Sequence, residues 1–247
     1  MPNPPRFPGR PGAWVLYKDN QLIAFNNPAG LPAVPDRKGS PNLLQIAAAY
    51  TRHDLYPIHR LDRPVSGVLV LARTSKAAGR LSDQFRRRQP DKRYLAVVEG
   101  LLRGDGLATD WLVKGDTGTV RRVSEATAGA KEARLRWRAL ASDGRRTLVE
   151  VELLTGRAHQ IRVQLAGLRA PIVGDLRYGA SGPLGDGRGI ALHAASLTVE
   201  HPTLRESMTW TAAPPARWRG LLDDAVAAAM DELGTEVSDG PARRSRA

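Results

Sequence analysis

Residues 59–72 read HRLDRPVSGVLVLA and join a charged turn to an unbroken apolar run. The run Val68–Ala72 contains no polar side chain, which is typical of a strand buried on both faces. Pro64 and Gly67 are turn-forming residues, so the chain changes direction before it enters the strand. The sequence therefore predicts a central strand, with Asp62 in the segment that leads into it. An isolated aspartate at such a position is most often a turn residue.

The segments before this strand predict a hairpin and a helix. Trp14–Tyr17 and Leu22–Asn26 are short apolar runs around a polar turn, a pattern typical of paired strands. Ser40 followed by Pro41 is typical of a helix start, with serine as the cap and proline in the first turn. The residues expected on the buried face of this helix are Leu43, Leu44, Ala47 and Tyr50.

The segments after the strand predict further helices and strands. Thr74 or Ser75 is the expected cap of a second helix, whose apolar stripe is Ala78, Leu81 and Phe85. Further strands are expected at Tyr94–Val98, Val149–Leu153 and Leu192–Val199. A last helix is expected to bury Trp218, Leu221, Leu222, Ala225 and Ala229. Many strands with interspersed helices and no regular βαβ repeat predict an α+β fold with a mixed or antiparallel sheet.

The composition points to a polyanionic partner. The 247 residues carry a formal net charge of +12, and nucleic acid is the commonest polyanion in a cell. The alternative is a solvated, arginine-rich surface. The absence of cysteine excludes disulfides and thiolate metal sites and fits a reducing cytoplasm. We find no secretory signal and no apolar run near the roughly 20 residues that span a bilayer, so we expect a soluble cytoplasmic protein.

We expect one folded domain between two less regular ends. Residues 1–12 are rich in proline and lack apolar periodicity, which indicates an extended lead-in. Residues 233–247 are polar and basic, which predicts a disordered tail. The domain between them, residues 13–232, contains no linker-like stretch and no internal repeat.

Three separated segments place polar side chains beside apolar elements. They are HRLDRPVSGVLVLA with Asp62, KRYLAVVEG (residues 92–100) with Tyr94, and LLTGRAHQIRVQLAGLRAPIVGDLRYG (residues 153–179) with Arg162. Taken alone, a tyrosine that begins a strand is most often a packing residue. An arginine on a short helix is most often a surface charge.

Taken together and in this order, the three segments closely resemble the motifs of the RluA-type pseudouridine synthases. NNPAGLPAVP (residues 26–35) and ALHAASLTVEHP (residues 191–202) extend the resemblance over nearly the whole chain. The resemblance implies a mixed, largely antiparallel β-sheet split by a central basic cleft, with flanking helices. It also implies the isomerisation of uridine to pseudouridine in RNA without a cofactor. By the same resemblance, Asp62 is the catalytic nucleophile, Tyr94 lies against the target base and Arg162 pairs with Asp62.

The chemistry of the reaction agrees with these residue types. The C1′–N1 bond must break, the base must turn, and a new bond must form through C5. Asp62 could attack the sugar, attack the base or remove a sugar proton, and the sequence leaves these routes open. An ionised carboxylate in a site without water needs a fixed cation, and Arg162 is always charged. Tyr94 offers a ring face on which a base can rotate and a hydroxyl that could move a proton.

A target base in structured RNA must be flipped out, which costs a few kcal/mol that contacts to the RNA backbone offset. The candidate RNA-binding residues are Arg60, Arg63, Arg86, Arg87, Arg88, Lys92, Arg93, Arg157 and His159. A second basic set is Lys114, Arg121, Arg122, Lys131, Arg134, Arg136 and Arg138. For either cluster the alternative is a solvated charged face. We hypothesise further that Arg60 fills the gap that the flipped base leaves.

Three positions depart from the family pattern. Val65, Asn27 and Gln164 stand where the family usually has Thr, Lys and His, and none of these changes removes a proposed catalytic group. No added N-terminal RNA-binding domain is recognised, so we expect the catalytic domain to select its RNA. The five histidines are scattered without metal-ligand spacing, and no metal site is expected.

Two other functions compete with the isomerase. One is a non-catalytic RNA-binding or RNA-folding protein on the same fold, and the other is a hydrolytic base-removing enzyme. A carboxylate repels phosphate, so Asp62 in a basic cleft argues against a pure binder. We expect an rRNA or tRNA substrate and a monomer, with no membrane and no protein partner.

Overall fold

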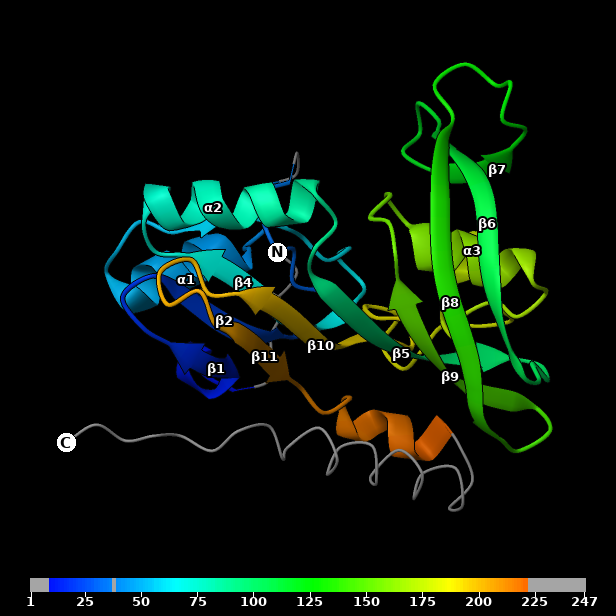
Figure 1. Ribbon diagram of the computed structural model, residues 1–247. Coiled ribbons are helices and arrows are strands. Elements are labelled where there is room, and N and C mark those ends of the chain that lie inside the picture. Colours follow the sequence, from blue (N-terminus) through cyan, green and yellow to red (C-terminus); the bar gives the residue numbers. More distant parts are fainter. Residues whose placement is uncertain (1–8, 37–38, 222–247) are drawn as a thin grey trace.

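The computed structural model describes residues 9–36 and 39–221, which form one twisted β-sheet with helices packed on it (Figure 1). The strands are β1 (Val15–Lys18), β2 (Leu22–Asn27), β3 (Tyr56–Pro57), β4 (Ser66–Ala72), β5 (Asp91–Glu99), β6 (Asp105–Lys114), β7 (Val120–Val123), β8 (Lys131–Ser142), β9 (Arg146–Leu153), β10 (Leu192–Glu200) and β11 (Ser207–Thr211). The α-helices are α1 (Leu43–Thr51), α2 (Ser75–Arg86) and α3 (Gln160–Gly167). Short 3-10 helices are η1 (Pro11–Trp14), η2 (Leu176–Tyr178) and η3 (Ala216–Leu221).

The sheet is continuous and mixed. Its strand order is β1-β2-β4-β10-β5-β9-β8-β6-β7, with β3 added to β4 and β11 added to β10. Only β4 and β10 pair in parallel among the described strands, with Ser66 opposite His193 and Gly67 opposite Ala194. The Oγ of Ser66 also lies 2.8 Å from Nδ1 of His193. The expected α+β fold with a largely antiparallel sheet is therefore confirmed.

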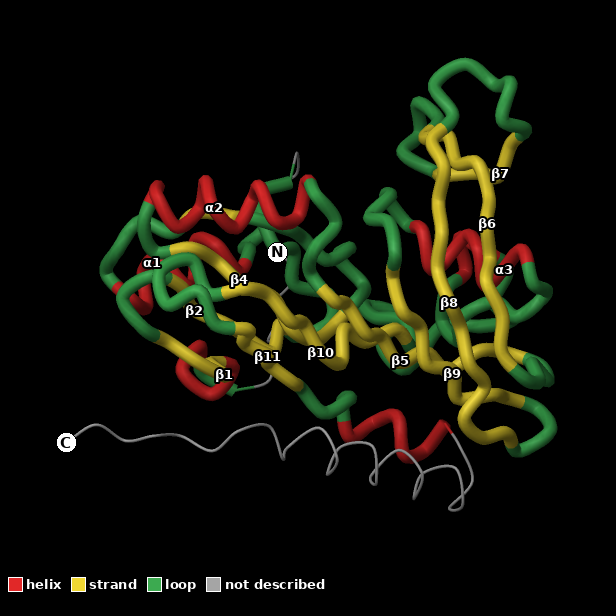
Figure 2. The backbone as a smooth tube through the Cα atoms, viewed as in Figure 1, coloured by secondary structure: helices red, strands yellow, loops and turns green. Residues whose placement is uncertain are grey.

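The strands β6, β7 and β8 and their loops, residues 105–142, form an arm. Figure 2 shows β6 and β8 rising away from the rest of the sheet, with β7 near the tip. The basic residues of this region predicted a charged cluster, and no strands were expected there. Their signal is a period of two in β8, where Ala133 and Leu135 are fully buried while Arg134 and Arg136 are not.

The centre of the sheet is buried on both faces, as the apolar run Val68–Ala72 predicts. Every residue of β4 is buried. Val70 packs in a cluster with Leu81 of α2, whereas Leu71 belongs to the main core cluster together with Leu43 of α1. The two helices thus cover opposite faces of β4 and exclude water from the strand that follows Asp62.

Two details predicted for α1 are wrong. Asn42 caps the helix in place of Ser40, because its Oδ1 accepts a hydrogen bond from the backbone N of Gln45 at 3.0 Å. Asparagine and serine cap helices about equally well, so the sequence alone did not separate them. Tyr50, expected on the buried face, is 48% exposed. It lies in the last turn of α1, which ends at Thr51, and it is not part of the core cluster that contains Leu43 and Ala47.

Other predicted elements agree with the structure. Thr74 is the cap of α2, and its Oγ1 accepts a hydrogen bond from the backbone N of Ala77 at 3.1 Å. The hairpin predicted near the start of the chain is the antiparallel pair β1 and β2. In β9 the buried residues Val149 and Val151 alternate with partly exposed glutamates, which confirms the half-buried strand.

Parts of the predicted chain ends lie outside the described residues. These parts are residues 1–8 of the lead-in 1–12 and the whole tail 233–247, so the domain bounds 13–232 stay a prediction. Of the last predicted helix the structure describes η3, where Trp218 is fully buried, whereas Leu222, Ala225 and Ala229 lie outside the described residues. Across 9–36 and 39–221, no helix is long and apolar enough to cross a membrane.

Gly67 is a position where only glycine fits. Its φ is +115°, and an added Cβ would lie 2.3 Å from the carbonyl oxygen of Ala194 on β10. We expect Gly67→Ala to lower the free energy of unfolding by about 2–5 kcal/mol, because backbone strain adds to overpacking. Urea denaturation followed by circular dichroism measures the change.

Gly79→Ala is the matched control, because Gly79 lies on α2 with nothing within 4 Å of an added Cβ. This variant should be more stable than the wild type by about 0.5–1 kcal/mol, since alanine has the higher helix propensity. A Gly67→Ala variant as stable as the wild type would show that β4 and β10 do not need this close approach.

Candidate active site

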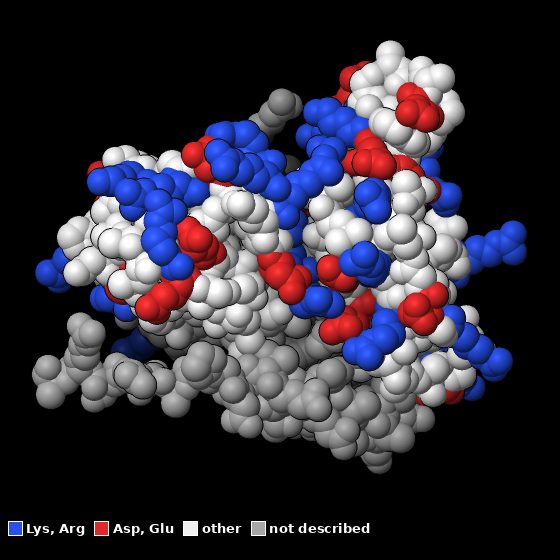
Figure 3. All heavy atoms as spheres, in the orientation of Figure 1, with Lys and Arg blue, Asp and Glu red and all other residues white. Residues whose placement is uncertain are grey.

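A basic cleft of about 720 Å³ lies where the loop before β4, the end of α2, β5 and the start of α3 meet. The basic residues that line it are Arg60, Arg86, Arg88, Lys92, Lys114, Arg157, Arg162 and Arg177. Among the described lining residues, Asp62 is the one carboxylate. Figure 3 shows lysine and arginine side chains gathered over α2 and at its junction with the arm. The cleft crosses one face of the sheet, and the strand pairing beneath it is uninterrupted.

The loop that carries Asp62 is fixed by a hydrogen bond within it and by two hydrogen bonds to Gly30. The backbone N of Val65 donates a hydrogen bond to the carbonyl oxygen of Asp62 at 2.9 Å, which closes a turn. The backbone N of Gly30 donates to the carbonyl oxygen of Arg63 at 2.7 Å. The Nε of Arg63 returns a bond to the carbonyl oxygen of Gly30 at 3.2 Å. The neighbour Leu61 is buried in the core, so the position of Asp62 is determined from both sides.

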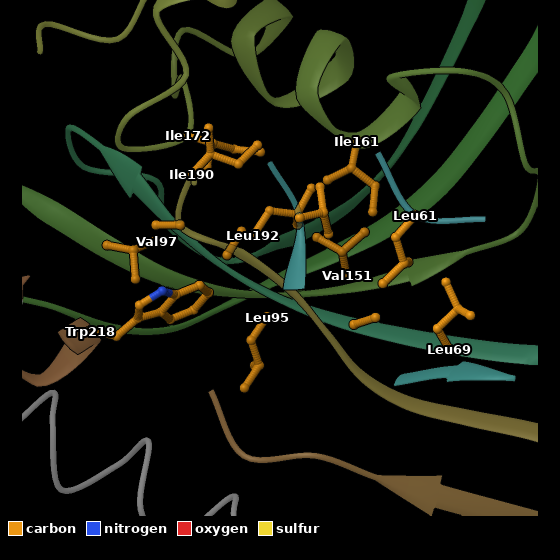
Figure 4. Packing of buried hydrophobic residues seen from close by; sticks show 14 of the residues in the cluster. Leu61, Leu69, Leu95, Val97, Val151, Ile161, Ile172, Ile190, Leu192 and Trp218 are labelled. Atoms are coloured by element: carbon orange, nitrogen blue, oxygen red, sulfur yellow. The ribbon is translucent and has the colours of Figure 1, made fainter. Parts of the chain in front are cut away.

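Asp62 and Arg162 meet because the residues before them share one core. Leu61 and Ile161 are each 4% exposed and belong to the same hydrophobic cluster. Figure 4 shows both side chains converging near Val151 of β9. Nη1 of Arg162 then donates a hydrogen bond to Oδ2 of Asp62 at 3.3 Å.

Arg162 is buried and is shared by two carboxylates. Its Nε and Nη2 donate to the two oxygens of Asp175 at 2.7 and 2.8 Å. Burial alone would lower the pKa of Arg162, but the hydrogen bonds and charge of Asp175, together with Asp62, raise it overall. The guanidinium also lies over the ring of Tyr178, with Cζ 5.0 Å from the ring centroid. A permanent cation is thus held against Asp62 with little freedom to move.

Tyr94 lies on β5 and lines the same cleft as Asp62. Burial raises the pKa of Tyr94 above its ordinary value, and the negative charge of Asp62 raises it further. The phenol therefore keeps its proton at neutral pH. Because side chains alternate along a strand, Lys92 also lines this cleft, whereas Arg93 lines a separate recess and lies 3.8 Å from Glu152.

His159 is the residue directly before α3 and has a left-handed backbone conformation, with φ 51° and ψ 20°. Its Nε2 lies 3.8 Å from Oδ2 of Asp62, and its Nδ1 lies 2.7 Å from the hydroxyl oxygen of Tyr178. The next residue, Gln160, fixes the start of the helix on β8 by donating from Nε2 to the carbonyl oxygen of Arg134 at 3.0 Å. The site therefore combines an ionised pair, a tyrosine and a histidine in a basic cleft.

Comparison with known proteins decides the family. The profile described as RNA pseudouridylate synthase matches residues 21–167. The tRNA pseudouridine synthase C of Yersinia pestis is 33% identical over an alignment of 231 residues, and the match covers 84% of this chain and 89% of that protein. The chain belongs to the RNA pseudouridylate synthase family. The resemblance noted in the three sequence segments is therefore confirmed.

Two further relatives of this synthase agree. The dual-specificity RNA pseudouridine synthase RluA of Salmonella typhi is 33% identical over 218 residues, covering 84% of this chain and 94% of that protein. The structure of human RNA pseudouridylate synthase domain containing 4 is 27% identical and superposes with a TM-score of 0.67. That match covers 83% of this chain and 91% of the human chain.

The structure of the synthase brings most of the predicted RNA-binding residues to the cleft. Those that line it are Arg60, Arg86, Arg88, Lys92, Arg157 and His159. Three others do not line it. Arg63 instead donates a hydrogen bond from its side chain to Gly30 beside the loop of Asp62, and Arg87 is the exposed C-cap of α2. The third that lies elsewhere is Arg93, in its separate recess.

Some residues of the second basic set also line the cleft, and others lie outside it. Lys114 lines the cleft from the arm. Arg136 and Arg138 line the separate recess with Arg93, where they lie 3.2 and 3.1 Å from Glu152 and Glu150. Arg136 and Arg138 therefore lie outside the cleft of Asp62, and the two glutamates partly neutralise their charge.

Two residues of the site, Asp175 and Tyr178, were not predicted from the sequence. Both lie in the third quoted segment, in GDLRYG. A buried arginine needs a carboxylate beside it, which is a usable signal. The sequence holds 25 acidic residues, however, and nothing in their spacing says which one Arg162 contacts.

Asp175→Asn keeps the shape of the side chain and removes its charge. We expect the free energy of unfolding to fall by about 3–5 kcal/mol, because a buried guanidinium loses its main partner. Turnover should fall by about 10²-fold, because Arg162 is no longer fixed against Asp62. Urea denaturation and release of tritium from 5-tritiated uridine in RNA measure the two effects.

Asp186→Asn is the control. Asp186 also pairs with an arginine, Arg188, but the two side chains are 53% and 48% exposed. Loss of an exposed pair should change stability by no more than about 1 kcal/mol. If both variants behave alike, Asp175 does not hold the site.

Proposed function

We propose that this protein isomerises uridine to pseudouridine in structured RNA, with Asp62 as the group that acts on the target nucleotide. The observation that carries the proposal is the ionic triad of Asp62, Arg162 and Asp175 in a basic cleft. A protein that only binds RNA gains nothing from a carboxylate that faces its ligand. Membership of the synthase family also favours catalysis over RNA binding alone and over hydrolytic base removal.

The isomerisation exchanges one bond for another. The C1′–N1 bond breaks, the uracil turns, and a C1′–C5 bond forms; C5 loses a proton and N1 gains one. Asp62 attacks the sugar, attacks the base or removes a sugar proton, and each route requires it to be ionised. Arg162 supports each route, because its fixed positive charge lies beside Oδ2 of Asp62 and favours the ionised carboxylate.

Tyr94 is the proposed surface for the moving base. A stacked ring tolerates rotation of the base in its own plane, whereas a hydrogen bond with fixed direction does not. The raised pKa of Tyr94 keeps its hydroxyl protonated at neutral pH, so the ring offered to the base carries no charge. This supports a role in holding the uracil while it turns.

The cations of the cleft are the proposed contacts to the RNA backbone. Burial lowers the pKa of Lys92, and the charge of nearby Arg88 lowers it further, whereas Asp91 acts in the opposite direction. A phosphate between Lys92 and Arg88 would relieve this repulsion. Arg60 lies exposed at the cleft, two residues before Asp62, which supports its proposed role in the gap left by the flipped base.

The class of RNA is a separate proposal. We propose a transfer RNA as the first substrate to test, because the relative from Yersinia pestis is named a tRNA pseudouridine synthase. Ribosomal RNA is the second, since the sequence did not separate the two. A monomeric state and a cytoplasmic location stay predictions.

Asp62→Asn should abolish the isomerisation. We expect the wild type to release tritium from 5-tritiated uridine in RNA and the variant to be slower by about 10³-fold or more. Binding to the same RNA should weaken by less than tenfold, because the variant keeps all the cations. Pseudouridine maps of tRNA and rRNA from a strain without the gene identify the site, which wild type should restore and Asp62→Asn should not. Two results together would favour the non-catalytic RNA-binding protein. One is that the wild-type protein releases no tritium, and the other is that loss of the gene leaves the pseudouridine map unchanged.

The dependence of binding on salt tests the cleft as the RNA interface. Arg88 and Lys114 line the cleft from α2 and from the arm. The double variant Arg88→Gln/Lys114→Gln should reduce the slope of log K against log salt by about 2, one for each lost phosphate contact. Arg136→Gln/Arg138→Gln removes the same charge outside the cleft and should leave the slope unchanged. Equal slopes for the two variants would place the RNA elsewhere.

A further inference from the structure

His159 lies between the carboxylate of Asp62 and the hydroxyl of Tyr178. Its Nε2 is 3.8 Å from Oδ2 of Asp62, which is too long for a hydrogen bond, so this nitrogen is available to a group that enters the cleft. Its Nδ1 is 2.7 Å from the phenol oxygen of Tyr178, which is a short hydrogen bond. Which of these nitrogens carries the proton decides what His159 offers to a ligand.

Tyr178 determines that proton's position. Its phenol oxygen accepts a hydrogen bond from the backbone N of Val120 at 3.1 Å. If the phenol proton is donated to Nδ1 of His159, both bonds of the hydroxyl are satisfied and the histidine proton lies on Nε2. In the other tautomer two N–H groups would point at one phenol oxygen, and the lone pair of Nε2 would face the negative charge of Asp62. The hydrogen bonds of the Tyr178 hydroxyl and the charge of Asp62 therefore both favour the Nε2–H tautomer.

His159 is neutral in this environment. Burial lowers its pKa below the ordinary value. Among the charged groups that face it, Arg162 and Arg177 lower the pKa further, while Asp62 and Asp175 act in the opposite direction. A neutral ring suits the site, because an imidazolium would pair with Asp62 and compete with Arg162 for its charge.

We propose that His159 is a neutral hydrogen-bond donor to the target uracil, through Nε2–H, and that Tyr178 is the positioning residue that fixes its tautomer. The proposal rests on the proposed function. When the C1′–N1 bond breaks or a nucleophile adds to the base, negative charge develops on the carbonyl oxygens of the uracil. A preorganised N–H beside Asp62 stabilises that charge on every route open to Asp62, and no proton is transferred.

The left-handed backbone of His159 provides a sharp test. At φ 51° asparagine is the more tolerant substitute, whereas glutamine is disfavoured. The amide nitrogen of glutamine, however, reaches about as far as Nε2, and that of asparagine only about as far as Nδ1. A structural role therefore predicts that His159→Asn is the better enzyme, and a donor role predicts that His159→Gln is.

We expect kcat for tritium release to fall by about 10²-fold in His159→Asn, as on loss of an oxyanion donor, and by about tenfold in His159→Gln. KM should change little in either. Circular dichroism shows whether both variants fold. Equal or higher kcat in His159→Asn, or wild-type kcat in both, would overturn the donor role.

Tyr178→Phe tests the tautomer directly. The variant keeps the ring beneath Arg162 and removes the hydroxyl. In ¹⁵N spectra recorded without RNA at neutral pH, we expect the Nε2–H tautomer of His159 in the wild type and a mixture of tautomers in Tyr178→Phe. In activity and binding assays, Tyr178→Phe should have a lower kcat and an unchanged Kd for RNA. Tyr50→Phe, at an exposed ring, should change none of these.

Isomerase activity and the tautomer of His159 together distinguish failure of this inference from failure of the proposed function. A wild type that is active but has the Nδ1–H tautomer, or a cationic His159 at neutral pH, would overturn this inference alone. A wild type without isomerase activity on tRNA and rRNA would overturn the proposed function and the inference with it.

Discussion

A guanidinium shared by two carboxylates in a water-poor site is the constraint on which the rest of the molecule depends. Removing the charge of Arg162 from water costs several kcal/mol, which its two hydrogen bonds to Asp175 help to offset. This leaves Nη1 to face Asp62. The geometry requires two distant segments to be held together, one with Asp62 and one with Arg162 and Asp175. The packing of Leu61 against the same core as Ile161 supplies that rigidity.

The fold could be predicted from sequence where one local signal dominates. The apolar run of β4, the Thr74 cap of α2 and the alternation in β9 each reflect a single physical preference. Prediction failed where two signals of similar strength compete, as for Ser40 and Asn42 at the start of α1. It also failed for β8, because the arginines along its exposed face were interpreted as a charge cluster rather than as one side of a strand.

The site divides in a similar way. Asp62, Tyr94 and Arg162 each lie in a segment with a recognisable motif, so the sequence could name them without showing their geometry. Asp175 and Tyr178 lie in the same motif segment as Arg162, but their role depends on through-space contacts with Arg162 that the sequence does not show. The candidate cations could be counted from sequence. Which of them face the cleft depends on strand alternation, which separates Lys92 from Arg93.

The parallel pairing of β4 with β10 has a consequence for how the protein is made. The contact between Ser66 and His193 joins residues separated by 127 positions. A ribosome extends a chain by about 5–20 residues per second, so the segment of Asp62 emerges roughly ten seconds before the strand that lies beside β4. Closing so long a loop is also a slow kind of folding step. The growing chain thus cannot complete the sheet beside the segment of Asp62 until almost the whole domain has been synthesised.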